Sequence, residues 1–253
     1  EYAEVQAVLT STQQDPHSYE ASARDQLLVN EATLTVANGG FYDDFFSRLV
    51  QASPNKFRNM QASMVDVSAA FGDADSPVAG NDHIWYDFKT MKAAATELAY
   101  RINLGLADPA ARQAVKNQAR DFANRIGDLE KTTAELRKSA TGKRAIATEG
   151  FSAYLLRNLG ITDATPNAFK LAVEEETDAS PAVMEELRLA LTEGRVDVLI
   201  VNEQTESAQT KRLVQWATDA DVPVVRMSET LPTGLNYQDW MLRNLIQLAN
   251  ALL

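Results

Sequence analysis

The chain contains no cysteine among its 253 residues. That absence excludes disulfide bridges, thiolate nucleophiles and cysteine-ligated zinc sites, and it leaves the redox compartment undetermined. Histidine is nearly absent as well, because only His17 and His83 are present and they lie far apart in the sequence. No local spacing marks the two as a metal site, and for a lone histidine a structural role is more common than metal binding.

Long hydrophobic runs are missing too. No stretch approaches the ~20 apolar residues of a membrane-spanning helix, and the chain opens at Glu1 without a basic and apolar leader, so we expect that any export signal or anchor was removed or never present. Basic residues are outnumbered, 24 against 35 acidic ones, which gives a net charge of -11. Such a field repels phosphate groups and attracts cations, so we expect no nucleic acid partner.

The apolar pattern predicts short strands that alternate with helices. This alternation is typical of parallel sheets with helices on their faces, in which ligands bind beyond the carboxyl ends of the strands. In the first half we expect strands at 5–9, 32–36 and 64–67, a helix at 22–30 and a polar loop over 72–82. In the second half we expect strands at 145–148, 169–173, 196–202 and 222–227, and helices at 151–159, 182–193, 209–217 and 237–253.

Two longer helices are predicted in the middle of the chain, where Ala, Leu, Arg, Lys, Gln and Glu recur with apolar residues at helical spacing. The first covers Asp87–Leu106, and the second begins at Pro109, directly after Asp108, and runs to Lys138. At 1.5 Å per residue the second helix is roughly 45 Å long, which is enough to bridge two lobes.

The fold class that follows is α/β, with two lobes that each have a mostly parallel sheet flanked by helices and that are joined by one long rigid linker helix. We expect an N-terminal lobe over residues 1–108, the linker helix over 109–139 and a C-terminal lobe over 140–253.

Common catalytic and phosphate-binding motifs are not found. Gly142-Lys143 lacks the upstream glycine of a phosphate loop, the sequence from Gly150 to Tyr154 lacks the second glycine of a nucleophile elbow, and no dinucleotide fingerprint occurs. What remains is a set of polar residues in loops after predicted strands. A carboxylate between a strand and a helix either caps the helix or binds a ligand, and the pattern alone leaves both roles open. The set consists of His17, His83, Glu149, Glu203 and Glu229.

Four segments, in their order and spacing, resemble the metal-binding solute-binding proteins of manganese and zinc ABC importers. The resemblance covers essentially the whole chain, and Asn38-Gly39 and the stretch "SPAVMEELRLALTEGRVDVLIVNEQ" are similar to that family as well. In that family two α/β lobes are tied by a long rigid helix, and one transition metal ion is buried between them. The segments are "DPHSYEAS" (15–22), "NDHIWYDF" (81–88), "TEGFSAYLLRNLGI" (148–161) and "NYQDWMLRNLIQLANAL" (236–252).

The resemblance implies a metal site made by His17, His83, Glu149 and Glu229, with no catalytic residues. It places Glu203 as a structural or supporting carboxylate. Several positions depart from the family pattern. Asp82 replaces the usual proline before His83, and we expect its carboxylate to face solvent rather than to orient the imidazole. Zinc-specific members often have a third histidine in place of Glu149. The usual fourth ligand is aspartate, so Asp239 competes with Glu229, although a surface or capping role suits Asp239 better. By this resemblance we expect the chain to begin near the family's second strand, so that the family's first strand and helix either lie before Glu1 or are absent from an unusual N-terminal lobe.

The implied ligand set bears on the metal. Two imidazoles and two carboxylates form a harder set of ligands than three imidazoles and one carboxylate. Harder ligands favour Mn(II), with Zn(II) a close second and Fe(II) also compatible. The function implied is capture of such an ion outside the cytoplasm and delivery to an ABC permease, by a monomer that a lipid attached before Glu1 would tether to the membrane. The alternatives are a metalloenzyme that uses the same four side chains and a surface adhesin of the same fold.

Overall fold

The computed structural model describes residues 3–11, 14, 18–40, 42–54, 64–67, 81–175 and 177–252. The chain divides into two compact units, one of Glu1–Thr10 and Pro16–Asp128 and the other of Ser11–Asp15 and Leu129–Leu253. We call them unit 1 and unit 2. The expected boundaries at 108/109 and 139/140 stay predictions.

Unit 2 is built on a four-stranded parallel sheet in the order β4-β3-β5-β6. The register pairs Ala145 with Val198 and Ile200 with Val225. Because both faces of such a sheet are covered by helices, its inner strand β5 is apolar up to Asn202, and all five of its residues are buried. The strands are β3 (Arg144–Ala147), β4 (Thr162–Asp163), β5 (Val198–Asn202) and β6 (Val224–Met227).

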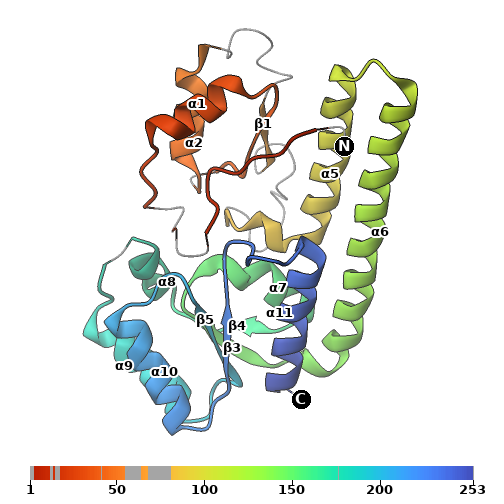
Figure 1. Cartoon of the computed structure of the whole chain (residues 1–253). Coiled ribbons are helices and arrows are strands. Elements are labelled where there is room, and N and C mark those ends of the chain that lie inside the picture. Colours follow the sequence, from red (N-terminus) through yellow and green to blue (C-terminus); the bar gives the residue numbers. More distant parts are fainter. Residues whose placement is uncertain are drawn as a thin grey trace. The chain divides into compact units, whose positions relative to one another are not determined.

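Helices lie on both sides of this sheet (Figure 1). One face presents Ile146, Leu199 and Val201 to a core that includes Phe169, Leu187 and further apolar side chains of α8, α9 and α10. Figure 1 shows α7 and α11 on the other side of the strands. The helical elements are η3 (Gly150–Ser152), α7 (Ala153–Leu159), α8 (Asn167–Glu174), α9 (Pro181–Thr192), α10 (Ala208–Asp219) and α11 (Tyr237–Leu252).

Unit 1 has a two-stranded parallel sheet and a small core. β1 pairs with β2 from Thr35↔Met64 to Ala37↔Asp66, and Val29, Phe45 and Leu49 form a buried cluster between α1 and α2. The elements are α1 (Ala23–Glu31), β1 (Thr35–Ala37), α2 (Asp44–Ala52), β2 (Met64–Asp66), η2 (Ile84–Tyr86) and α5 (Phe88–Gly105).

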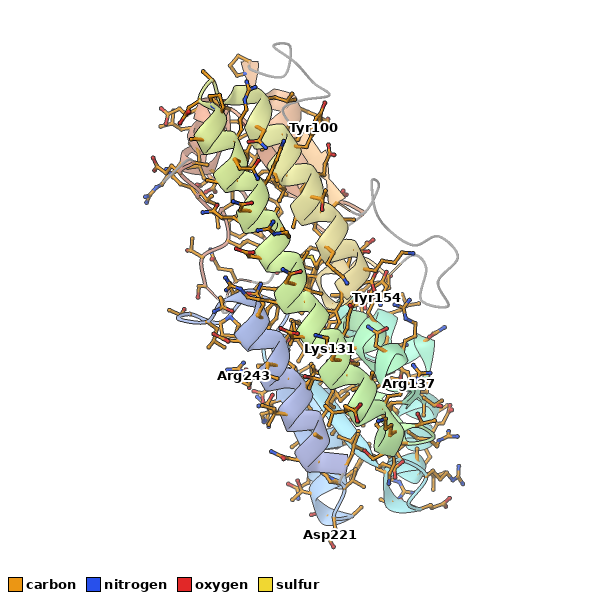
Figure 2. The ribbon with its side chains drawn as sticks, turned by 90° about the vertical axis from the view of Figure 1, so that its right-hand side faces the viewer. Tyr100, Lys131, Arg137, Tyr154, Asp221 and Arg243 are labelled. Carbon is orange, nitrogen blue, oxygen red and sulfur yellow. The ribbon has the colours of Figure 1, made fainter. Side chains whose placement is uncertain are left out.

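The longest helix is α6, Pro109–Ala140, whose residues to Asp128 belong to unit 1 and whose residues from Leu129 belong to unit 2. Its start is set by Asp108, whose carboxylate accepts from the backbone N–H groups of Ala110 and Ala111 (3.0 and 3.3 Å). Near its end lies Arg137, labelled in Figure 2, which donates from Nη1 to the carbonyl oxygens at 157 and 158 and so joins α6 to the end of α7.

The α/β class with parallel sheets flanked by helices is confirmed, but two predicted strands are wrong. Residues 5–9 form no strand, because Val8 and Leu9 pack against the small core of unit 1 while Val5 is 89% exposed. Residues 169–173 belong to helix α8: Phe169, Ala172 and Val173 are buried at helical spacing and Leu171 is 55% exposed. The predicted loop over 72–82 lies outside the described residues except for its last two positions.

None of the described helices is both long enough and apolar enough to cross a membrane.

Candidate metal-binding site

The four predicted ligands are distributed over both units. Glu149 and Glu229 belong to unit 2, and His83 belongs to unit 1. His17 lies outside the described residues. Within the described part of either unit, no group of three or more His, Asp or Glu side chains is arranged to hold a metal ion.

In unit 2 the two carboxylates follow strands that flank β5. Glu149 comes two residues after the end of β3, and Glu229 comes two residues after the end of β6. Since all strands are parallel, both positions lie at the carboxyl edge of the sheet, where ligands bind in folds of this class. Both residues are almost fully buried, with 1% and 2% exposure.

The Glu149 carboxylate receives a hydrogen bond on each oxygen. Asn202, the last residue of β5, donates from Nδ2 to Oε2 (2.8 Å), and the Thr205 hydroxyl donates to Oε1. Asn202 is itself held in place, because its backbone N–H donates to Thr148 Oγ1 (3.0 Å) and its Oδ1 accepts from the Gln204 N–H (3.0 Å). The orientation of the carboxylate is fixed by side chains of the neighbouring strand and its exit.

The surroundings of Glu149 and Glu229 disfavour a negative charge on both side chains at once. Burial raises the pKa of the Glu149 carboxyl well above its ordinary value, and the Glu229 carboxylate beside it raises that pKa further. The hydrogen bond from Asn202 acts in the opposite direction, whereas a hydrogen bond with Glu229 and the charge of Glu174 add to the increase. A cation placed between two such carboxylates would remove their repulsion and stabilise both in the ionised form.

In unit 1, His83 is 3% exposed and directly precedes the 3-10 helix η2 as its N-cap residue. Its backbone N–H donates to Asn81 Oδ1 (2.9 Å), and the same oxygen lies 2.9 Å from its ring Nδ1. Because a backbone N–H can only donate, the Asn81 atom at this place must be the oxygen, and Nδ1 must then carry the hydrogen. In the neutral ring the lone pair then lies on Nε2, where it could bind a metal ion.

The loop that carries His83 is tied to the loop after β1. Asn38 Nδ2 donates to the Asp82 carbonyl oxygen (2.7 Å), and the backbone N–H groups of Asn38 and Gly39 donate to the Asp43 carboxylate (2.7 and 2.9 Å). Gly40 has a positive φ of 66°, and a Cβ at that position would lie 2.0 Å from Asp82 Oδ1. The Asp82 side chain thus packs against this glycine, and Asn81 is the residue that orients the imidazole.

The described residues just after His17 are anchored to α1. Tyr19 Oη donates to Asp25 Oδ2 (3.0 Å), and its ring meets that of Phe45 edge-on with centroids 4.9 Å apart. Ser22 caps the helix, since its hydroxyl accepts from the Asp25 N–H and its own backbone N–H donates to Asp25 Oδ2 (2.7 Å). The described residues that follow position 17 are thus fixed to α1 and α2.

Two carboxylates that the sequence left open are placed at the surface of unit 2. Glu203 is exposed, and its backbone N–H donates to the Met227 carbonyl oxygen (3.0 Å). Asp239 is exposed in the first turn of α11, where it exchanges hydrogen bonds with Asn236 (2.7 and 3.0 Å). The supporting residues Asn202, Gln204 and Thr205 were missed. Their only signal in the sequence was a position at or directly after the end of a predicted strand, and the neighbouring Glu203 carries a charge and so was the more obvious candidate.

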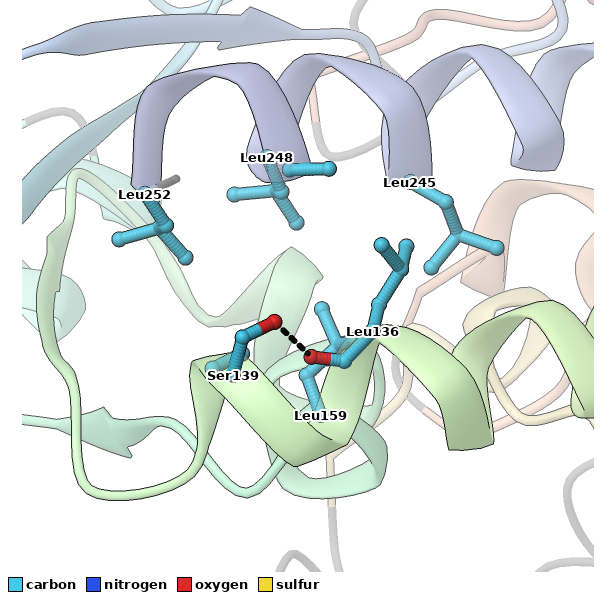
Figure 3. Close-up of a pocket in the computed structure, with 8 residues that line it drawn as sticks. Leu136, Ser139, Leu159, Leu245, Leu248 and Leu252 are labelled. Carbon is cyan, nitrogen blue, oxygen red and sulfur yellow. Dashed lines mark hydrogen bonds between the residues drawn. The ribbon is translucent and has the colours of Figure 1, made fainter.

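A small apolar hollow between the ends of α6 and α11 is a poor candidate for this chemistry (Figure 3). Its polar side chain, Ser139, donates its hydroxyl to the Leu136 carbonyl oxygen (3.1 Å). The remaining lining consists of Ala140, Leu159, Leu245, Leu248, Ala249 and Leu252.

The fold is shared with several solved structures of solute-binding proteins. FpvC from Pseudomonas aeruginosa in complex with Mn2+ is 22% identical, with a TM-score of 0.73 over 96% of this chain and 88% of that one. The periplasmic zinc-binding protein TroA from Treponema pallidum is 16% identical, with a TM-score of 0.75 over 95% and 88%. The laminin-binding protein Lmb of Streptococcus agalactiae is 18% identical, with a TM-score of 0.72 over 94% and 87%.

At these identities the solved structures support the fold alone. No curated protein sequence matches the chain. The family model described as "ZnuA: Zinc-uptake complex component A periplasmic" matches residues 1–251. With nearly its whole length matched, the chain belongs to the ZnuA family, the periplasmic metal-binding proteins that serve ABC importers.

Proposed function

We propose that the protein binds one divalent transition metal ion through His17, His83, Glu149 and Glu229 and delivers it to an ABC permease. The observation that carries the proposal is the pair of buried carboxylates Glu149 and Glu229 at the carboxyl edge of one sheet, where burial and the neighbouring Glu229 raise the pKa of Glu149. A bound cation would reverse that penalty. The tautomer of His83, with its lone pair on Nε2, suits the same role.

Mn(II) is the favoured ion, with Zn(II) second. Two carboxylates supply up to four oxygens besides the two imidazole nitrogens, which suits the higher coordination number of Mn(II). Zinc binds more tightly than manganese to most ligand sets, so Zn(II) has the lower Kd in solution even if Mn(II) is the transported ion. The metals named for similar structures are Mn2+, Ni2+ and zinc.

The partners follow from this role. We infer a monomer that works outside the cytoplasm, tethered by a lipid that would precede Glu1, and that presents its metal to the permease without catalysing a reaction. The two alternatives, a metalloenzyme and an adhesin of the same fold, are separated from this proposal by metal transfer: only the transport protein needs to exchange its ion with a permease.

The test is elemental analysis of protein purified without added metal, followed by zinc and manganese titrations of matched variants. Glu149→Gln and Glu229→Gln remove buried carboxylates, and Glu203→Gln removes an exposed one after the neighbouring strand. We expect Glu149→Gln and Glu229→Gln to weaken Mn(II) binding by about 100-fold or more, because each removes a metal ligand. Glu203→Gln should leave the Mn(II) affinity unchanged.

The histidines and the identity of the metal are tested in the same titrations. His17→Ala should abolish tight binding of both ions, and Glu149→His should shift the preference toward zinc, because it restores three imidazoles and one carboxylate. Unchanged Mn(II) and Zn(II) affinities in His17→Ala would show the ligand assignment to be wrong. Glu229→Gln with wild-type affinity, together with weakened binding in Asp239→Asn, would transfer the fourth ligand to Asp239.

A further inference from the structure

The segment Asn202–Thr205, which we call the β5 exit, contacts the Glu149 carboxylate and the backbone of Glu229. It leaves the sheet between the strands that precede Glu149 and Glu229, because β5 lies between β3 and β6. Three of its four side chains form hydrogen bonds with the loops that carry Glu149 and Glu229, and the fourth, Glu203, is exposed. One short segment therefore acts on the positions of two predicted ligands that are far apart in the sequence.

Toward Glu149, the β5 exit supplies one donor to each carboxylate oxygen. Asn202 donates to Oε2 and Thr205 donates to Oε1. A carboxylate has about four lone-pair sites on its two oxygens, so one acceptor site on each oxygen remains for a metal ion. Two donors on opposite oxygens also resist rotation of the carboxylate plane, because any rotation lengthens at least one of the bonds.

Toward Glu229, the β5 exit acts through Gln204. Its Oε1 accepts from the backbone N–H groups of Glu229 (2.7 Å) and Thr230 (2.9 Å) and from the Thr230 hydroxyl (3.3 Å). Its Nε2 donates to the carbonyl oxygen of Gln14 (3.4 Å), which belongs to the same unit and lies three positions before His17 in the sequence. Gln204 thus fixes the backbone from which the Glu229 side chain leaves.

We propose that Asn202, Gln204 and Thr205 are positioning residues that set the metal preference. Asn202 and Thr205 hold the Glu149 carboxylate ready to donate both of its oxygens, and Gln204 fixes the backbone from which the Glu229 side chain leaves. The proposal rests on the proposed function, since it presumes that Glu149 and Glu229 bind the ion. A tetrahedral zinc ion needs one oxygen from each carboxylate and tolerates a rotated group. Mn(II) is bound more weakly by the same donors and prefers six ligands, so it depends more on the second oxygen. Loss of the β5 exit contacts should therefore weaken manganese binding more than zinc binding.

The decisive variants are Thr205→Val, which keeps the shape and removes the hydroxyl, and Gln204→Met, which keeps the length and removes the amide. Glu203→Gln is the matched control in the same segment, and Thr205→Ser should restore the wild-type behaviour. Far-UV circular dichroism and thermal unfolding of each metal-free variant establish that it is folded.

The readouts are the Kd values for Mn(II) and Zn(II), measured by competition with a chelator, and the Mn(II) electron paramagnetic resonance spectrum. We expect Thr205→Val and Gln204→Met to weaken manganese binding about 10- to 100-fold, the usual cost of removing a residue that orients a metal ligand. Zinc binding should weaken several-fold less, so that the ratio of the two Kd values changes, and the spectrum should show an altered coordination environment.

Equal weakening of both metals, or wild-type affinities in both variants, would overturn the proposal. The controls keep this result distinct from failure of the proposed function. If Glu149→Gln loses metal and Thr205→Val behaves as wild type, the ligand assignment stands and the role of the β5 exit is refuted. If Glu149→Gln also binds as wild type does, the ligand assignment itself has failed.

Discussion

Replacing Asn81 tests how the His83 imidazole is prepared for a metal ion. In the structure Asn81 Oδ1 accepts from the His83 backbone N–H and from ring Nδ1, both at 2.9 Å. Asn81→Ala removes both bonds and leaves the ring without the acceptor that holds hydrogen on Nδ1. Asn81→Asp keeps an acceptor at the same place and gives it a negative charge, which makes the imidazole a more basic ligand.

The magnitude follows from the hydrogen bonds that are lost. A neutral hydrogen bond contributes about 0.5–1.5 kcal/mol net, and one to a charged group about 1.5–3 kcal/mol. The ring bond becomes partly charge-assisted when Nε2 binds a cation, so its loss should cost about 1–2 kcal/mol of binding free energy, or roughly 5- to 30-fold in Kd. The backbone bond is present with and without metal, so its loss should lower the stability of the protein and leave the affinity unchanged.

The assay is a Zn(II) and Mn(II) titration of wild type, Asn81→Ala, Asn81→Asp and His83→Ala at low and high salt. We expect weaker binding in Asn81→Ala and tighter binding in Asn81→Asp, with the gain retained at high salt, because a short contact is screened less than a long-range field. Wild-type affinity in Asn81→Ala, with binding lost in His83→Ala, would refute the role of this hydrogen bond. Weaker binding in Asn81→Asp would refute the assignment of hydrogen to Nδ1.

Three further predictions concern stability. Gly40→Ala should lower the free energy of unfolding by about 1–3 kcal/mol in urea titrations, since it adds a clash with Asp82 to the cost of a positive φ. At Gly142 (φ 87°) a Cβ would have nothing within 4 Å, so Gly142→Ala should lower it only by the cost of the positive φ, about 1–2 kcal/mol. In the metal-free protein the pKa of Glu149 is raised, so between the ordinary and the raised pKa the folded state keeps a proton that the unfolded state releases. The free energy of unfolding should therefore fall as pH rises through that interval. Glu149→Gln should remove this slope in urea titrations at a series of pH values. Asp25 behaves in the opposite way: the backbone hydrogen bond from Ser22 lowers its pKa, so its contribution should be present above its ordinary pKa and lost as pH falls through the lowered one, and Asp25→Asn should flatten acid unfolding there.

Much of the fold could be predicted because its long elements carry strong local signals. The start of α6 at Pro109 was predicted from side-chain chemistry within one turn, and the helix begins there. Helix α5 begins at Phe88, one residue after the expected start, because Asp87 caps it. The errors fell on short apolar runs. The apolar pattern of residues 169–173, taken alone, fits both a strand and a helix. The helix is favoured only because its apolar side chains pack into the core of unit 2. The stretch 5–9 is apolar because it covers a core between two helices, which no periodicity reveals.

The candidate site was predictable to the level of the strand ends and no further. Glu149 and Glu229 follow strands of one parallel sheet, and the structure places both carboxylates together, as expected from the position of ligands in such sheets. To choose between Asn202, Glu203 and Gln204, one must know which residues at the end of β5 point toward the candidate site. Because β5 is buried on both faces, its apolar run shows no alternation, so the sequence could not indicate which of these polar residues faces the carboxylates.

The identity of the metal depends on more than the types of its ligands. A carboxylate donates one oxygen or two according to how its plane is held, so two sites with the same four side chains can have different coordination numbers. In this chain the plane of Glu149 is held by donors on opposite oxygens, Asn202 and Thr205. Counting imidazoles and carboxylates in the sequence therefore fixes only the range of metals that the site accepts. On the proposed ligand set, the preference within that range would depend on residues that do not touch the ion. A hydroxyl-to-methyl change at Thr205 is therefore expected to alter the ratio of two affinities rather than abolish either.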